Sequence, residues 1–270
     1  MKNKILATVS IFALMGMMPA MADTSKSQSQ INAEASTSGH ITKDAKEAIE
    51  KIKSDASEAY EEIKATLIGN KKDDKNIPLV ISSQKTASGM IDHNVYNEKH
   101  EIVAKVADII LDKDGKAIMI VVVGDKFLGM GKQAAFDFGS VTRVEEDGDV
   151  IMPLTEKIID NAAPFSYDNT DGNDRVRVVP DNGYRVSKLL DGKLVNQKKE
   201  IVADIENISF KNGMAETLII GFDKILGLGG QRAAITYSSA TIIRDGEALN
   251  FQLSNENEAR VNTYKETVMK

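Results

Sequence analysis

The chain has 270 residues, a formal net charge of −6, no cysteine and no tryptophan. The lack of cysteine excludes disulfides, thiol catalysis and thiolate metal sites. We expect no nucleic-acid partner, because phosphate groups repel an acidic protein and aromatic residues for base stacking are scarce.

The first residues have the pattern of a secretory signal peptide. Lys2 and Lys4 precede an apolar run that ends at Met18, and the small residues from Ala20 to Ala22 fit a signal peptidase site. The run is short for a membrane span. We therefore predict a signal peptide over residues 1–22, a periplasmic destination and no membrane span after cleavage, with an uncleaved N-terminal anchor as the alternative.

A polar spacer and an amphipathic helix follow in the predicted order of elements. Residues 23–41 are rich in Ser, Thr, Gln and Asn, and this composition buries too little apolar surface to fold. Residues 42–69 place apolar side chains at alternating steps of four and three, which predicts a helix with one apolar stripe. We expect the stripe to bind a partner through Ile49, Ile52 and Ile63.

The partner of this helix stays open at the level of sequence. A second copy of the chain would give a homo-oligomer, and docking on the protein's own surface would leave a monomer. A membrane interface fits least, because the polar face is not rich in Lys and Arg alone and the apolar face has no Trp or Phe.

Short β-branched runs joined by tight turns begin after the charged residues 71–76, and they predict a mainly β fold. Asp112-Lys-Asp-Gly115 has the composition of a hairpin turn. The run from Ala117 to Val123 is apolar on both faces, so we predict a central strand. Residues 161–181, with two prolines, are predicted to be a linker between domains, and residues 254–270 a C-terminal helix or tail.

The β segment repeats at an offset of 98 or 99 residues. Glu101-Ile-Val-Ala104 returns as Glu200-Ile-Val-Ala203, and Phe127-Leu-Gly-Met-Gly131 returns as Ile225-Leu-Gly-Leu-Gly229. A phosphate-binding loop fits poorly, because Met130 rather than Lys follows Gly129 in the pattern that begins at Gly124, and Lys132 is not repeated in the second copy. We therefore predict that four glycines with positive φ angles form structural turns: Gly129, Gly131, Gly227 and Gly229.

The order of these landmarks resembles the PRC-barrel family, the small β-barrel shared by the H subunit of photosynthetic reaction centres and a ribosome maturation factor. The resemblance rests on Ala87-Ser-Gly-Met-Ile91, Val95-Tyr-Asn97, the segment from Asp108 to Gly115 and the glycine-bearing turn. It covers residues 78–160 and 182–253. It implies two tandem small PRC-like β-barrels, each partly open and six-stranded, behind the amphipathic α-helix.

The second copy departs from the first at two acidic positions. Asn207 replaces Asp108 and Lys211 replaces Asp112, so the carboxylates are not kept across the copies. A carboxylate pair of Glu101 with Asp108 is therefore not predicted as a catalytic device.

The remaining polar clusters do not fit a reactive site. His93 and His100 are interpreted as exposed loop residues rather than as zinc ligands or members of a triad. Asp168, Asp171 and Asp174 are interpreted as a solvated linker, with loose calcium binding as the alternative. We predict no catalytic, cofactor-binding or metal-binding residue and no cofactor.

PRC-barrel domains resemble docking modules rather than enzymes. We therefore expect an exported, non-catalytic binding and assembly module that acts through protein–protein contacts in the cell envelope. The alternative is a binder of a small molecule or an envelope polymer that uses the groove between the two barrels.

Overall fold

The computed structural model describes residues 62–69, 75–124, 131–168, 175–222 and 231–268. The chain divides into two compact units, residues 1–48 and 49–270, and all described residues belong to the second. The predicted signal peptide, the spacer and most of the predicted helix lie outside the described residues. No helix in the described ranges is long and apolar enough to cross a membrane.

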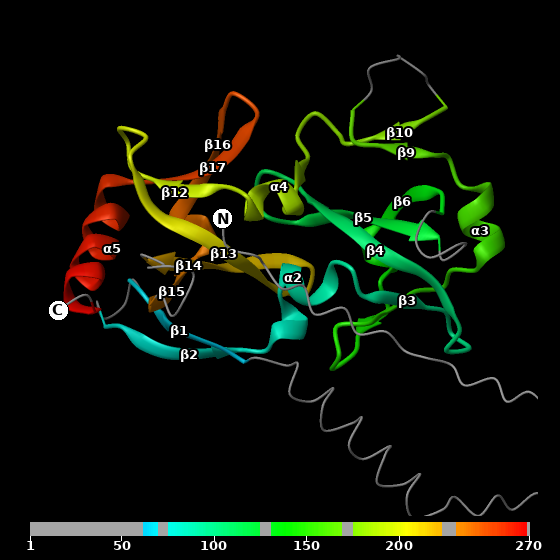
Figure 1. The fold of residues 1–270 in the computed structure, drawn as a ribbon, viewed down its shortest axis with the longest axis horizontal. Coiled ribbons are helices and arrows are strands. Elements are labelled where there is room, and N and C mark those ends of the chain that lie inside the picture. Colours follow the sequence, from blue (N-terminus) through cyan, green and yellow to red (C-terminus); the bar gives the residue numbers. More distant parts are fainter. Residues whose placement is uncertain (1–61, 70–74, 125–130, 169–174, 223–230, 269–270) are drawn as a thin grey trace, which may run out of the picture. The chain divides into compact units, whose positions relative to one another are not determined.

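The described chain is mainly β, as the sequence predicts, and its strands form two large sheets (Figure 1). The first sheet has the spatial order β6 (Gln133–Asp137), β5 (Ala117–Gly124), β4 (Ile102–Leu111), β3 (Asn94–Tyr96), β8 (Val150–Ile151) and β7 (Arg143–Val144), with β11 (Tyr184–Arg185) also paired to β4.

The second sheet has the spatial order β16 (Ala240–Asp245), β17 (Ala248–Leu253), β12 (Lys193–Val195), β13 (Ile201–Lys211), β14 (Met214–Phe222), β15 (Gln231–Thr236), β1 (Ile63–Leu67) and β2 (Ile77–Ile81). Neither sheet closes on itself among the described residues.

Short helices connect the strands. The α-helices are α2 (Ala87–Met90), α3 (Glu156–Asn161), α4 (Val186–Leu190) and α5 (Asn255–Val268), and the single 3-10 turns are η1 (Ser83–Lys85), η2 (Phe138–Ser140) and η4 (Tyr237–Ser239). Thr86 begins α2 by accepting a hydrogen bond from the Gly89 N–H, and Thr155 begins α3 in the same way from Ile158.

The two sheets repeat one strand order. Read from β6 to β7, the first sheet matches the second read from β15 to β16, strand for strand. The central hairpins also share an irregularity. The register of β4 against β5 shifts between Val106 and Asp108, and that of β13 against β14 shifts between Ile205 and Asn207, 99 residues later.

A turn before each long strand repeats at the level of single hydrogen bonds. Asn97 Oδ1 accepts from the backbone N–H groups two and four residues later, and its Nδ2 donates to Glu101 Oε2 over 2.7 Å. Asn196 makes the same three bonds, including 2.7 Å to Glu200 Oε2. The sequence repeat therefore corresponds to a repeat in local structure.

One hydrophobic core extends through both sheets. Helix α2 packs against β13 and helix α4 packs against β4, so each helix covers a strand of the opposite sheet. Their buried side chains are Ala87 and Met90 in α2, and Val186 and Leu189 in α4. Since each large aliphatic side chain contributes about 1.5–3 kcal/mol when fully buried, this exchange stabilises the contact between the sheets.

The predicted helix over residues 42–69 is wrong at its C-terminal end. Ile63–Leu67 form strand β1, which pairs antiparallel with β2 and parallel with β15. Ile63 is buried beside Ile81 and Ile219, so it is not on an exposed helical stripe. The free edge of β15 and the alternation of side chains in this short segment favour a strand.

The predicted domain boundaries also need correction. Strand β2 was expected to open the first barrel, but it belongs to the second sheet, while β11 from the second copy pairs with β4 of the first. The predicted linker contains β9 (Phe165–Ser166) and β10 (Arg177–Val178), and Phe165 is buried against the first sheet. Helix α5 lies within the predicted C-terminal segment 254–270 and is the helix that was one of its two predicted forms.

Candidate functional site

The two sheets meet at the tips of their central hairpins. Lys116, which follows the β4–β5 turn, forms an antiparallel bridge with Met214, at the start of β14. The Ala117 N–H donates to the Gly213 carbonyl over 2.8 Å, and the Ala215 N–H donates to the Gly115 carbonyl over 2.8 Å. The two halves therefore contact one another reciprocally, as identical subunits do around a two-fold axis.

Asp108 holds the start of helix α4 on the first sheet. Its side chain is fully buried and accepts hydrogen bonds from the Ser187 N–H at 3.0 Å, the Ser187 hydroxyl at 2.6 Å and Arg185 Nε at 3.2 Å. It also accepts from the N–H of Ile109. These four bonds satisfy a buried carboxylate, so Asp108 is a structural residue of the contact.

Asn207 does the same for helix α2 on the second sheet. Its Oδ1 accepts from the Ser88 N–H at 3.2 Å and from the Ile208 N–H at 2.9 Å, and its amide donates to the Ser88 hydroxyl. The change from Asp108 to Asn207 removes the charge but keeps the role. Thr86 stands at the position that Arg185 occupies in the other half. Because Thr86 carries no charge, the neutral amide of Asn207 can take the place of the carboxylate there.

Tyr167 covers the ion pair of Asp108 with Arg185. The Arg185 guanidinium lies over the Tyr167 ring, 3.5 Å from its centre. Burial, together with the charge of Asp108, raises the pKa of the Tyr167 hydroxyl to about 12 against the lowering effect of Arg185. This hydroxyl therefore remains protonated at physiological pH.

A pocket opens on one side of this contact, with a volume of about 480 Å³. Its lining comes from η1, α2, η2 and β7 of the first half and from the end of β13 and the turn after it in the second. The apolar lining residues are Met90, Phe138, Val141, Val144 and Phe210, and the polar ones are Gln84, Lys85, Thr142, Arg143, Lys211 and Asn212. The volume lies in the range of ligand pockets, about 300–1,000 Å³.

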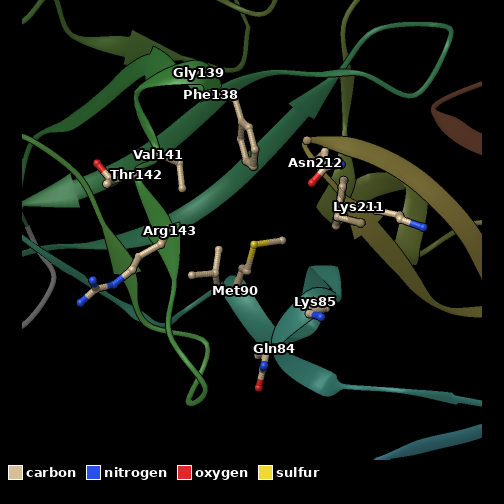
Figure 2. Close-up of a pocket in the computed structure, with 13 residues that line it drawn as sticks. Gln84, Lys85, Met90, Phe138, Gly139, Val141, Thr142, Arg143, Lys211 and Asn212 are labelled. Atoms are coloured by element: carbon tan, nitrogen blue, oxygen red, sulfur yellow. The ribbon is translucent and has the colours of Figure 1, made fainter.

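The apolar groups of this pocket face inward. Figure 2 shows the Phe138 ring and the Met90 side chain directed toward one another, while the Arg143 and Lys211 side chains extend to opposite sides. Arg143 pairs with Glu145 at 2.5 Å and Lys211 with Glu216 at 3.3 Å. Lys85 is exposed and forms no ion pair with any described residue. The pocket therefore has apolar lining residues, and Lys85 at its edge has no ion pair within the part of the chain that the structure describes.

Two tyrosines stand at the corresponding positions on the opposite side of the contact. Tyr237 corresponds to Phe138, and Tyr184 corresponds to Lys85. Burial chiefly, followed by Asp112 and Tyr184, raises the pKa of the Tyr237 hydroxyl. This hydroxyl has no hydrogen-bond partner among the described residues. The repeated strands thus have a filled side, where Tyr184 and Tyr237 lie, and an open side, where Lys85 and Phe138 line the pocket.

A second hollow, of about 560 Å³, is acidic. It is lined by Tyr96, His100, Glu145, Glu146, Asp147, Asp149 and Ile151. Burial and the charge of Asp149 raise the pKa of Tyr96, and His93 Nδ1 lies 3.5 Å from Asp149 Oδ1. Within the described ranges, no group of three His, Asp or Glu side chains is arranged to hold a metal ion.

The comparison with known families decides the nature of the first half. Residues 84–156 match the family model of the PRC-barrel domain. This segment is a PRC-barrel domain. Its match runs from η1 to the start of α3 and leaves out β2, in agreement with the place of β2 in the second sheet. None of the curated proteins compared with the chain matches it. A PRC-barrel domain indicates a non-catalytic binding or assembly module.

Most of the residues singled out from the sequence lie outside the described residues: Ile49, Ile52, Gly129, Gly227 and Gly229. Gly131 lies in the connection between β5 and β6 of the PRC-barrel domain. A Cβ atom there would lie 2.1 Å from the Gly124 carbonyl oxygen. The close approach of the backbone explains why this position needs a glycine.

Glu101 and Asp108, which the sequence does not predict to act as a pair, form separate contacts in the structure. Glu101 bonds Asn97 in its turn, whereas Asp108 bonds Ser187, so the two carboxylates serve different contacts. Sequence reasoning missed Lys85 and Phe138 as pocket residues. The sequence did contain a signal, because both residues are replaced by tyrosine in the second copy. Such a change in side-chain size between repeated positions indicates that the two halves differ in shape there.

Proposed function

We propose that the chain is a non-catalytic binding and assembly module, built from the PRC-barrel domain and a divergent second copy of it. It acts through protein–protein contacts in the cell envelope, after export directed by residues 1–22. The observation that supports this proposal is that different groups at the contact between the sheets have different roles. The buried polar groups hold the two halves together, and the adjoining pocket remains open.

The reactive side chains at this contact are already engaged. The Ser187 hydroxyl and the Arg185 guanidinium both bond Asp108, which is closed off from solvent. A nucleophile needs a base and an approach path for substrate, and this serine donates its proton to a buried carboxylate within the fold. These contacts support a binding module rather than an enzyme.

Exposed apolar side chains at repeated positions support contacts with another protein. Ile102 at the start of β4 and Ile201 at the start of β13 correspond to one another, and they are 42% and 67% exposed. Single exposed aliphatic residues are common, but two at equivalent positions give each half the same apolar point beside its asparagine turn.

Crosslinking in the native cells tests the proposal. The tagged full-length chain is expected to be crosslinked to one discrete partner protein. When that partner carries the tag instead, it is expected to recover the chain. Recovery of uncrosslinked monomer alone, at several crosslinker lengths, would contradict the assembly function. N-terminal sequencing of the chain from the envelope fraction is expected to begin at Asp23, and retention of Met1 would contradict cleavage.

A second candidate function is the binding of a small molecule between the two halves. The pocket favours it, because both halves line the pocket and its volume suits a ligand. Thermal-shift measurements against panels of aromatic compounds and glycans test this candidate. A saturable rise in melting temperature would support it, and flat responses across both panels would exclude those compound classes.

A further inference from the structure

The filled side of the contact identifies the kind of group that fits the open side. Tyr184 is half-buried against the shared core, and the Arg244 guanidinium lies 5.9 Å from the centre of its ring. Its hydroxyl is close enough to Tyr237 to raise the pKa of that neighbour. One aromatic ring, supplied by the chain itself, therefore completes the second half.

The first half has the same framework without this ring. Lys85 takes the position of Tyr184 in the repeat, and its exposed side chain leaves Phe138 and Met90 facing the pocket. Phe138 also packs beside Gly213, as Tyr237 packs beside Gly115. The open side thus retains the aromatic floor on which a second ring can pack.

The charge at the mouth adds a second property to the occupant. Among the described residues, no acidic side chain lines the pocket, and two of the three lining cations pair with Glu145 and Glu216. Lys85 remains as a cation without an ion pair among the described residues. An acidic residue next to the incoming ring would complement this charge.

We propose that the pocket beside Phe138 and Lys85 receives an aromatic side chain from a partner protein, presented within an acidic segment. The inference rests on the proposed assembly function and names the contact by which that function operates. The ring packs on Phe138 at the position that corresponds to Tyr184 in the repeat, and the flanking carboxylate pairs with Lys85.

Binding of short capped peptides to the full-length chain tests the proposal. The probe is a fluorescently labelled Gly-Glu-Tyr-Glu-Gly peptide, compared with Gly-Glu-Ala-Glu-Gly and Gly-Lys-Tyr-Lys-Gly by anisotropy. We expect binding of the first peptide to exceed that of each comparison peptide by about tenfold. In NMR spectra of the isotopically labelled chain, the first peptide is expected to shift the backbone signals of Met90, Phe138 and Val141.

Two substitutions at Lys85 test the contributions of the aromatic ring and of the charge to peptide binding separately. Lys85→Tyr supplies the missing ring from the chain itself and is expected to weaken binding of the Glu-Tyr-Glu peptide by about tenfold or more. Lys85→Glu is expected to remove the preference for the Glu-flanked over the Lys-flanked peptide. Lys157→Tyr, at an exposed position of α3 away from the pocket, is the matched control and is expected to leave binding unchanged.

Several outcomes would overturn the inference. These are equal binding of the tyrosine and alanine peptides, signal shifts away from the pocket, or full binding by Lys85→Tyr. If p-cresol alone binds as tightly as the peptide, the site serves small molecules. If Lys85→Tyr dissociates an oligomer of the chain, the occupant is a second copy. If the partner crosslinked in cells is still recovered with Lys85→Tyr, the assembly function stands and this docking contact is wrong.

Discussion

Lys116 pairs with Met214 in an antiparallel bridge, although the two residues hold the same position in the two halves of the chain. A residue can face its own equivalent in this way only at a two-fold axis. The flanking hydrogen bonds, from Ala117 to Gly213 and from Ala215 to Gly115, obey the same relation. The contact between the sheets is therefore built as a dimer interface within one chain.

The two turn glycines beside this axis are expected to differ in tolerance. Both have positive φ angles, 85° at Gly115 and 73° at Gly213. A Cβ atom at Gly115 would lie 2.6 Å from the Tyr237 ring, whereas one at Gly213 would lie 3.6 Å from the Phe138 ring. Gly213→Ala should lower the free energy of unfolding by about 1–3 kcal/mol, the cost of a left-handed residue, and Gly115→Ala by clearly more. Urea denaturation followed by circular dichroism measures both, and equal losses would show that the Tyr237 contact has no role.

Asn207→Asp is expected to destabilise the fold in a pH-dependent way. The position is buried, and Thr86 supplies no positive charge to pair with a carboxylate there. An unpaired buried charge costs about 3–5 kcal/mol, so the variant should lose this much free energy of unfolding at pH 7. Burial would raise the pKa of the new carboxyl above its unfolded value, so stability is present below the unfolded pKa and is lost as the pH rises through the folded one.

Denaturation at pH 5 and pH 7 measures this effect. The loss in Asn207→Asp should be smaller at pH 5. The matched control is Asp108→Asn, which removes the carboxylate from Arg185 and introduces no new titratable group at the contact. A loss in Asn207→Asp that is the same at both pH values would contradict the explanation by charge burial.

Tyr237→Phe is expected to stabilise the protein. The Tyr237 hydroxyl is buried without a hydrogen-bond partner among the described residues, and the corresponding residue in the first half is Phe138. Because an unsatisfied buried polar group costs about 1–3 kcal/mol, its removal should raise the free energy of unfolding by about 1 kcal/mol. Scanning calorimetry should then show a rise of about 2–4 °C in melting temperature. A fall would indicate that the hydroxyl has a partner in solution.

Stability is expected to decline at alkaline pH through Tyr167. Its folded pKa of about 12 exceeds the ordinary value of 10.0, so the folded state holds the proton more tightly than the unfolded state does. The contribution is present below pH 10 and is lost as the pH rises through about 12. Tyr167→Phe should show a shallower decline over this range than the parent chain. Tyr264→Phe, in helix α5, is the control, and identical profiles for all three proteins would refute the assignment to Tyr167.

The local structure of this fold could be predicted from the sequence, because it depends on neighbouring residues. The hairpin turn that ends at Gly115 is present, with Asp112 Oδ1 accepting from the N–H groups of Asp114 and Lys116. The central strand predicted from Ala117 is β5, between β4 and β6. Composition and alternation contain this information because they act within a few residues.

The choice of partner strands could not be predicted in this way. β2 and β11 each join the sheet of the opposite half, and a strand's own sequence does not tell which free edge it will meet. The segment Ile63–Leu67 continues a helical spacing in sequence, yet the edge of β15 makes it a strand. The pocket was equally hidden, because the sequence does not show that Lys85 and Tyr184 lie at equivalent places beside the contact between the sheets.

The covalent link between the halves has a consequence for stoichiometry. A symmetric pair of separate chains would present two identical sides at its interface, either both open or both filled. Here the halves can differ, so Tyr184 closes one side while Lys85 leaves the other open. Under the proposed docking, the described part of each chain presents this pocket on one side of the contact, so we expect one aromatic segment to bind there per chain.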